Sequence, residues 1–218
     1  VSKLLDFLFR YQKNYLKLDK KQRQEFFYDQ RTNYNLQRFN TDYDKYSEQW
    51  FPRAAQLIFL NRTCFNGLYR VNSKGEFNSP AGDYDNPTIC DEQNLMAVHQ
   101  VLQIAEIKKA DFRQVVADLK EKSFVYFDPP YRPISKTANF KSYSKQDFAD
   151  NEQIELSKLF RDIDKEGIKV MLSNSDPKNN NPTDKFFDDI YSDYNILRVP
   201  ARRMINSDPT KRGAINEI

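Results

Sequence analysis

Two consecutive prolines end an apolar stretch in the second half of the chain and limit what that stretch can form. Residues 123–127 read SFVYF, and the chain continues with Asp128, Pro129, Pro130 and Tyr131. Because proline cannot donate to a β-ladder, the apolar stretch is predicted to be a buried strand that ends abruptly at the prolines. The chain must then turn at this strand tip.

The sequence around this strand alternates between apolar stretches and helical periodicity. Strands that alternate with helices are typical of an α/β sheet, so we predict the α/β fold class. Gly167 is placed to end the helix before the second buried strand. The predicted strands are residues 105–108, 123–127, 168–175, 194–201 and 213–218, and the predicted helices are residues 91–104, 111–119, 147–166 and 183–190.

The first 90 residues have a different sequence pattern from the rest of the chain. Apolar residues at helical spacing predict helices over 2–18, 19–33 and 44–64, with Asp19 as the cap of the second. Short alternating segments around Ser73-Lys74-Gly75 then predict a β-hairpin, with glycine at the turn position that needs positive φ. We therefore expect a helical subdomain that carries a hairpin at about residues 65–80.

Composition excludes several classes of protein. No apolar run approaches the roughly 18 residues of a membrane-spanning helix, and no secretory signal is recognisable. Two cysteines (Cys64 and Cys90) cannot build a disulfide scaffold, which makes a reducing cytoplasm the expected location. With a single histidine, His99, a Cys/His zinc site is excluded, and we expect no metal. His99 lies in an apolar-periodic run and is expected on a helix.

Glycine is scarce, and the ends of the chain are unusual. There are 5 glycines in 218 residues, about a third of the usual frequency. The chain starts at Val1 rather than methionine and stops at Ile218 inside an apolar segment. We expect a piece of a longer protein, with any glycine-rich nucleotide-binding loop outside this sequence.

Charge is distributed unevenly. Residues 1–90 hold 14 lysines and arginines against 10 acidic residues, whereas residues 91–218 hold 20 against 21. The first part is the better candidate for contact with a polyanion, although an excess of this size is also typical of an ordinary solvated surface.

The strand tip at residues 128–131 combines groups that suit one kind of ligand. In open α/β sheets, ligands collect outside the carboxyl ends of the strands. The Asp128 carboxylate and the rigid Pro129 carbonyl both accept hydrogen bonds, and the Tyr131 ring can stack. This set suits an amino group on a flat ring. The alternative is a strand followed by a proline-rich turn with no ligand.

Several blocks of the sequence resemble one family. The DPPY block, NRTCFNGLYRVNSKGEFNSPAGDYDNP, VMLSNS and KRGAINEI are similar to segments of the Dam-type (D12 class) DNA adenine methylases. The resemblance covers nearly the whole chain. It implies a Rossmann-like, S-adenosylmethionine-dependent methyltransferase sheet with an inserted, mainly helical target-recognition domain. Residues 1–90 correspond to most of that insertion and residues 91–218 to the C-terminal part of the catalytic domain.

The resemblance also implies a reaction and its residues. A methyl group passes from S-adenosylmethionine to N6 of an adenine flipped out of double-stranded DNA, within GATC, with no metal. The family's N-terminal segment, with its lysine and glycine-rich loop, is missing here. The implied catalytic residues are Asp128, Pro129, Pro130 and Tyr131, and the implied cofactor-binding residues are Asp111, Phe112 and Asp128. Asp111 and Phe112 can equally be a helix cap followed by a core residue.

In the hairpin block, Arg70 can contact guanine through two hydrogen bonds, while Leu68 and Pro80 can touch a thymine methyl group. Phe65, Asn66 and Tyr84 are expected to line the opened base stack, and Phe140 is a possible second wall for the flipped base or a packed loop residue. Possible phosphate contacts are Arg62, Lys74, Arg202, Arg203, Lys211 and Arg212, each of which can also be simple solvated surface.

Two other functions remain open at this stage. A truncated, inactive relative would bind DNA without using the cofactor. An enzyme that methylates another amino group, in RNA or in a protein glutamine, generally has asparagine rather than aspartate before the two prolines and lacks this hairpin. The family resemblance implies a monomer.

Overall fold

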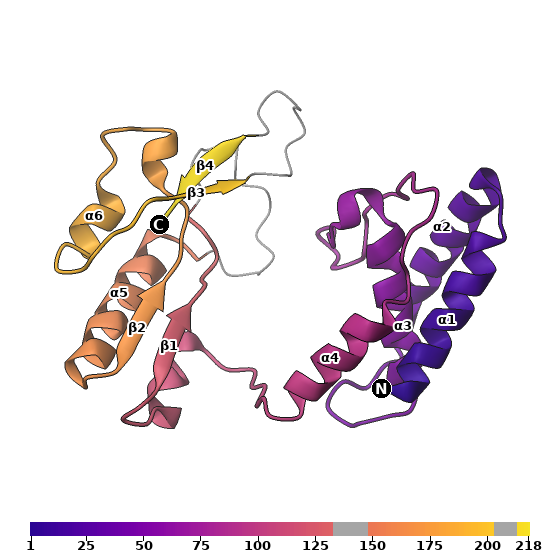
Figure 1. Ribbon diagram of the computed structural model, residues 1–218, viewed down its shortest axis with the longest axis horizontal. Helices are drawn as coiled ribbons and strands as arrows, with labels where there is room; N and C mark the ends of the chain where they lie inside the picture. Colours follow the sequence, from indigo (N-terminus) through magenta and orange to yellow (C-terminus); the bar gives the residue numbers. More distant parts are fainter. Residues whose placement is uncertain (133–147, 203–212) are drawn as a thin grey trace. The chain divides into compact units, whose positions relative to one another are not determined.

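The computed structural model in Figure 1 describes residues 1–132, 148–202 and 213–218. The chain divides into two compact units, Val1–Ile107 and Lys108–Ile218. Four predicted contact residues, Phe140, Arg203, Lys211 and Arg212, lie outside the described residues, as does nearly all of the polar loop that follows Tyr131.

The first unit is mainly helical, and it extends to Ile107, beyond residue 90, the end of the predicted helical subdomain. Its helices are α1 (Ser2–Leu16), α2 (Lys20–Gln37), α3 (Trp50–Thr63) and α4 (Glu92–Leu102). Asp19 caps α2 as expected: its carboxylate accepts from the Gln22 backbone N–H, and the Gln22 side chain accepts in return from the Asp19 N–H. No helix in the described part of the chain is long and apolar enough to cross a membrane.

The third helix starts later than the predicted residue 44. The Asp42 carboxylate accepts hydrogen bonds from the backbone N–H groups of Asp44 and Lys45, at 2.9 and 3.3 Å. A short acidic side chain that bonds the backbone in this way stabilises a turn instead of a helix. Helix α3 therefore begins at Trp50.

Aromatic rings fill the core of the first unit. Phe59 on α3 is fully buried and stacks on Tyr11 of α1, with ring centroids 4.8 Å apart. Tyr15 and Phe26 meet the same ring edge-on, at 5.3 and 5.5 Å. Burial raises the pKa of Tyr11 to about 12. These contacts join α1, α2 and α3.

The predicted hairpin is present beside these helices. Asn72 N–H donates to Glu76 O and Asn78 N–H to Arg70 O, each at 2.9 Å, and Gly75 at the turn has φ +73°. Towards its base the pairing changes register, since Phe65 N–H donates to Pro80 O. The residues that this change of register leaves unpaired on the first strand include a 3₁₀ turn, Phe65–Gly67, in which Asn66 and Gly67 have positive φ.

The second unit contains a parallel strand pair covered by a helix. Strand β1 (Phe124–Phe127) pairs in parallel with β2 (Lys169–Leu172), and α5 (Asp150–Lys165) connects them. Val125 and Phe127 are buried, whereas Phe124 and Tyr126 are exposed, so only one face of β1 packs into the core. Gly167, with φ +77°, ends the helical segment as predicted.

The remaining elements of the second unit follow in order. Helix α6 spans Phe186–Ile190, and β3 (Val199–Arg202) pairs antiparallel with β4 (Ala214–Glu217). Ile218, which follows β4, exchanges two backbone hydrogen bonds with Asn174, at 2.8 and 2.9 Å. The chain is therefore a mixed helix and strand protein. Its described strands form two small sheets, and the larger Rossmann-like sheet with an inserted domain stays a prediction.

Three further sequence predictions of secondary structure are wrong. Only the end of the strand predicted at residues 194–201 is a strand, since β3 begins at Val199. Residues 105–108 are not a strand, because the segment buries no apolar face: Ile107 is 81% exposed. Residues 112–118 form a 3₁₀ turn rather than an α-helix, and Asp111 caps it by accepting from the Arg113 N–H at 3.0 Å.

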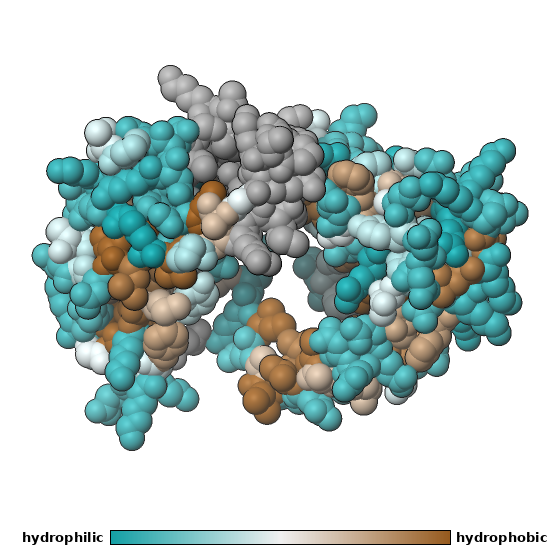
Figure 2. All heavy atoms as spheres, turned by 45° about the horizontal axis from the view of Figure 1, so that its top comes forward, coloured by the Kyte–Doolittle hydropathy of each residue, from teal (hydrophilic) through white to brown (hydrophobic). Residues whose placement is uncertain are grey.

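Apolar surface remains on both units. Helix α4 has no buried residue. Val101 and Leu102 at its end are exposed, and so is Ile104, which follows the helix. In the second unit, Phe124 and Met171 are 62% and 52% exposed on the uncovered face of β1 and β2. Figure 2 shows such hydrophobic patches against a mostly hydrophilic surface.

The cap of α2 provides a test of this fold. Asp19→Ala removes the hydrogen bond to the Gln22 N–H, so we expect the free energy of unfolding to fall by about 1 kcal/mol in urea denaturation. The matched control is Asp29→Ala, an exposed aspartate inside the same helix, with an expected change below about 0.5 kcal/mol. Equal effects of the two substitutions would contradict the capping role.

Candidate functional site

The DPPY residues lie directly after β1, at its carboxyl end. Asp128 is exposed and Pro129 half-buried, so the carboxylate is open to solvent. Among the described residues, none donates a hydrogen bond to the Pro129 carbonyl. Two acceptors are therefore available at one strand tip, in keeping with the sequence prediction. No group of three or more side chains able to hold a metal ion occurs in the described ranges.

Ser173, at the carboxyl end of β2, holds one oxygen of the Asp128 carboxylate. Its hydroxyl donates to Asp128 Oδ1 at 3.2 Å, and the Tyr126 hydroxyl lies 2.7 Å from the same Ser173 oxygen. The parallel pairing of β1 and β2 brings these ends together, and Ser173 N–H continues the ladder by donating to Phe127 O at 3.0 Å. No described residue donates a hydrogen bond to Oδ2, and the Asp128 side chain is exposed.

Tyr131 is fixed through its hydroxyl group while its ring stays partly open. The hydroxyl donates to Ser173 Oγ at 3.3 Å and to Glu217 Oε2 at 3.5 Å. Tyr131 is 38% exposed. Burial raises the pKa of Tyr131, so the phenol stays protonated and remains a donor near neutral pH. A ring held in this way is suited to stacking on a planar ligand.

Two fully buried side-chain amides support the DPPY segment from the interior of the second unit. Gln153 on α5 donates to the Pro130 carbonyl at 3.1 Å. Asn174 donates to Gln153 Oε1 at 3.2 Å and accepts from the backbone N–H groups of Arg132 and Ser175, both at 2.9 Å. Because both amides are buried and paired, they fix the backbone that follows the prolines.

Arg132 extends this support to two other elements. Its guanidinium donates to Asp150 at the start of α5 and to Asp184 before α6, at 2.7 and 2.9 Å. It also stacks over Phe186, 4.3 Å from the ring centre. Hydrogen bonding to Asp150 and then to Asp184 raises the pKa of Arg132. The chain is thus anchored immediately after Tyr131.

Asp111 and Phe112 have a clear structural role. The Arg113 guanidinium donates to both oxygens of Asp111 at 3.0 Å and covers the Phe112 ring at 4.5 Å. The backbone hydrogen bond from Arg113, together with its side chain, lowers the pKa of Asp111. Half of the Asp111 side chain is exposed. A carboxylate has about four lone-pair sites, so Asp111 can still accept from a ligand; its cofactor role stays a prediction.

Five of the predicted DNA-reading residues lie on the hairpin or on the 3₁₀ turn at its base. Arg70 and Pro80 are exposed, Leu68 is half-buried, and Phe65 is 56% exposed on the 3₁₀ turn beside Asn66. Arg70 Nε donates to Asn78 Oδ1 at 3.1 Å on the opposite strand. This bond uses Nε, so the two terminal nitrogens of the exposed guanidinium have no hydrogen-bond partner among the described residues and can serve as donors.

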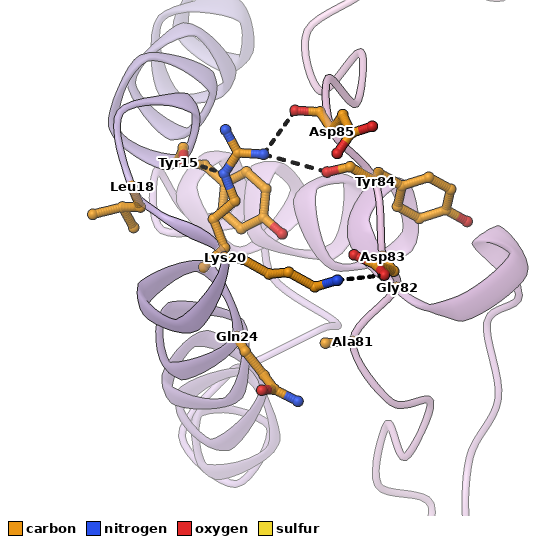
Figure 3. A pocket seen from close by; sticks show the side chains of 10 residues that line it. Tyr15, Leu18, Lys20, Gln24, Ala81, Gly82, Asp83, Tyr84 and Asp85 are labelled. Carbon is orange, nitrogen blue, oxygen red and sulfur yellow. Dashed lines mark hydrogen bonds and ion pairs between the residues drawn. The ribbon is translucent and has the colours of Figure 1, made fainter.

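Tyr84 lies next to a polar hollow between the α1–α2 turn and residues 81–85, shown in Figure 3. The hollow has a volume of about 490 Å³. Arg23 crosses it and donates to the backbone carbonyls of Tyr84 and Asp85, at 3.3 and 2.7 Å. The Tyr84 hydroxyl donates to Cys64 O, and its ring covers Gly82, where a Cβ atom would lie 2.3 Å from it. Arg23 and Gly82 therefore fix Tyr84 in place.

The sequence analysis missed Ser173, Gln153, Asn174 and Arg132. Ser173 and Asn174 belong to the VMLSNS block, which contributed to the family resemblance without a role for either residue. Nothing in the local sequence links Gln153 or Arg132 to the strand tip. Their roles depend on α5 folding back onto β1 and β2.

Fold and site together define an α/β protein that presents hydrogen-bond acceptors and an aromatic ring at the tip of a parallel strand. Comparison with known families identifies the family to which this α/β protein belongs. Residues 2–205 match the model of the D12 class N6 adenine-specific DNA methyltransferases, and the chain belongs to this family.

Known relatives agree with this assignment. The chain is 46% identical over 212 residues to the type II methyltransferase M.MjaIII of Methanocaldococcus jannaschii, covering 97% of this chain and 69% of that protein. It is 40% identical to M1.LlaDCHI of Lactococcus lactis subsp. cremoris, covering 80% and 59%, and 34% identical to a DNA adenine methylase of Haemophilus influenzae, covering 79% and 58%. The matched part of the chain thus spans between 58% and 69% of the length of these relatives.

Removing one buried amide tests the support of the site. Asn174→Ala leaves the Arg132 and Ser175 N–H groups and Gln153 Oε1 without their partner. Since an unpaired buried polar group costs about 1–3 kcal/mol, we expect the free energy of unfolding to fall by at least about 2 kcal/mol. Asn180→Ala, at an exposed position of the same unit, is the control. An unchanged denaturation midpoint for Asn174→Ala would show that the amide does not support this segment.

Proposed function

We propose that this chain is the recognition and DPPY-bearing part of a site-specific DNA adenine methyltransferase. It transfers a methyl group from S-adenosylmethionine to N6 of an adenine flipped out of double-stranded DNA. The observation that carries the proposal is the solvent-open Asp128 carboxylate next to the Pro129 carbonyl, to which no described residue donates, in a chain of this family. When bound, S-adenosylmethionine supplies an electrophilic sulfonium methyl group.

The residues at the strand tip suit the chemistry of the adenine amino group. The N6 lone pair is delocalised into the ring, which makes the nitrogen a poor nucleophile. Asp128 and the Pro129 carbonyl can accept its two N–H groups and favour a pyramidal nitrogen whose lone pair points away from the ring. Because Ser173 and the buried amides fix these acceptors beforehand, catalysis depends mainly on orientation and electrostatics.

Tyr131 stabilises the flipped base. Extrusion of a base from the duplex costs a few kcal/mol. Stacking on an aromatic ring returns about 1–3 kcal/mol per base in single-strand binding. The partly open Tyr131 ring, held by its hydroxyl, offers such a surface without further ordering.

The described residues fit one end of the cofactor. The half-exposed Asp111 can accept from the cofactor's adenine amino group, and the exposed Asp128 can line the place where the methyl donor and the adenine meet. The Phe112 ring is covered by Arg113, so stacking there requires that the arginine move. The chain spans only 58% to 69% of the length of these relatives, so the proposal for the cofactor is limited to these residues.

The hairpin supplies the sequence preference in this proposal. Arg70 reads guanine, Leu68 and Pro80 touch a thymine methyl group, and Phe65 and Asn66 enter the opened stack. The preferred site is GATC, read by a monomer in the cytoplasm. A DNA adenine methylase among the relatives, at 34% identity, supports adenine as the target base.

A protein that only binds DNA is the alternative. It would keep the hairpin but show no heat of binding for S-adenosylmethionine in calorimetry, with or without DNA. Methylation of RNA or of a protein side chain is disfavoured, because aspartate precedes the two prolines and the hairpin is present.

The Asp128 carboxylate is the residue to test first. In the full-length protein, we expect Asp128→Ala to lower methyl transfer to duplex DNA by about a hundredfold or more, because one preorganised acceptor is lost. DNA affinity measured by fluorescence anisotropy is expected to remain. Asp193→Ala, an exposed aspartate of the same unit, is the control. Methylation at the unaltered rate by Asp128→Ala would refute the assigned role.

Arg70 tests the reading of the site. We expect Arg70→Ala to weaken discrimination at one base pair by about 1–3 kcal/mol, measured as methylation rates on duplexes with single base-pair changes. Lys74→Ala, at the exposed hairpin tip, is expected to weaken binding to all duplexes alike and to lower its salt dependence. Unchanged discrimination in Arg70→Ala would rule out direct reading by this residue.

A further inference from the structure

Three side chains on one face of α2 hold the returning strand of the hairpin. Arg31, Asn35 and Arg38 are spaced by four and three residues, so they lie on the same side of the helix. Each donates to backbone carbonyls within residues 74–79. We refer to these three residues as the α2 ladder.

Asn35 is the central member and bonds the strand in both directions. Its Nδ2 donates to Phe77 O at 3.0 Å, and its Oδ1 accepts from Phe77 N–H at 2.8 Å. A neighbouring β-strand makes the same pair of bonds to an edge residue. The Phe77 ring is 2% exposed and meets Tyr34 and Tyr69 edge-on, at 6.4 and 5.4 Å. The strand is thus fixed by its backbone and by its side chain.

The two arginines hold the strand on either side of Phe77. Arg31 Nη1 donates to Ser79 O at 2.9 Å, and its guanidinium lies over Tyr28. Arg38 Nη1 donates to Lys74 O at 2.6 Å, and its guanidinium lies over the Phe39 ring at 4.6 Å. Each guanidinium therefore has both a carbonyl partner and an aromatic support, which limits its freedom.

The hairpin depends on such support because its own pairing is sparse. Within the described residues its two strands share one isolated bridge above the base, Val71–Phe77, which is formed by the backbone bonds of Asn72 and Asn78. An isolated two-stranded hairpin is marginally stable in water. The residue that follows Phe77 is Asn78, whose Oδ1 accepts from Arg70 Nε at 3.1 Å. The strand that the α2 ladder fixes therefore also orients the Arg70 guanidinium.

We propose that Arg31, Asn35 and Arg38 are positioning residues for sequence recognition. They fix the backbone of residues 74–79 and, through Asn78, the direction in which Arg70 presents its donors. The α2 ladder thereby sets how strongly the protein distinguishes base pairs, although it acts through the hairpin. The proposal rests on the proposed function of the hairpin in reading DNA.

Asn35→Leu in the full chain tests the proposal, with Asn33→Leu as its control, since Asn33 is an exposed residue of the same helix. Amide hydrogen exchange reports whether Phe77 N–H loses its protection. Fluorescence anisotropy on duplexes with single base-pair changes reports the binding preference, and methyl transfer to the same duplexes is measured in parallel. The shape-matched Asn35→Asp, which keeps the acceptor and loses the donor, serves if Asn35→Leu does not fold.

We expect Asn35→Leu to lower the ratio of affinities for the best and the altered duplexes about tenfold, at the base pair that Arg70 reads. Asn35→Asp is expected to give a smaller loss at the same base pair, and Asn33→Leu none. A merely structural role would instead lower the melting temperature and weaken binding to every duplex equally. That outcome, or an unchanged preference after loss of Phe77 protection, would overturn the proposal.

The binding measurement and the methyl-transfer measurement separate this proposal from the function on which it rests. Lost binding preference in Asn35→Leu alone supports the α2 ladder even if the unaltered protein transfers no methyl group, and in that case the enzymatic proposal fails by itself. If the unaltered protein binds all duplexes equally, there is no preference to set, and the positioning role is refuted.

Discussion

The site depends on a pair of buried side-chain amides that are hydrogen-bonded to each other and to the backbone. Two prolines remove the backbone donors that would extend β1, so the chain beyond Asp128 cannot be held by strand pairing. Gln153 and Asn174 replace that pairing by bonding the Pro130 carbonyl and the Arg132 N–H from the interior. The other side of the segment stays open, and the acceptors proposed to bind a base are fixed before it arrives.

The first unit uses the same physical solution. Asn35 bonds both backbone groups of Phe77, and Gln12 Oε1 accepts from the N–H groups of Ile89 and Cys90 at 3.1 and 3.0 Å. Within the described residues, side-chain amides thus support the irregular segments in both units where ladders are short. The price is that each amide must find its partners, because a buried polar group without one is destabilising. This arrangement makes the proposed reading and reacting groups rigid without a large sheet.

Sequence reasoning recovered what local signals determine. The Asp19 cap, the Gly75 turn, the alternation in β1 and the abrupt end at Pro129 each follow from a few neighbouring residues, and the structure confirms them. The prediction of a strand at residues 105–108 is wrong, because an apolar residue alone does not provide a neighbouring strand. Ser173, Gln153 and the α2 ladder were missed for a related reason. Their partners are 36 to 48 residues away in the sequence, apart from the Gln153–Pro130 and Gln153–Asn174 bonds, and only tertiary packing brings them together.

The most direct test is to identify the methylated product. Plasmid DNA would be incubated with the full-length protein and isotopically labelled S-adenosylmethionine, hydrolysed to nucleosides and analysed by mass spectrometry. The account predicts label in N6-methyladenine and in no other nucleoside. Label in a cytosine derivative, or label only in RNA or protein added to the same reaction, would contradict the claim that the strand tip after β1 binds the amino group of a DNA adenine.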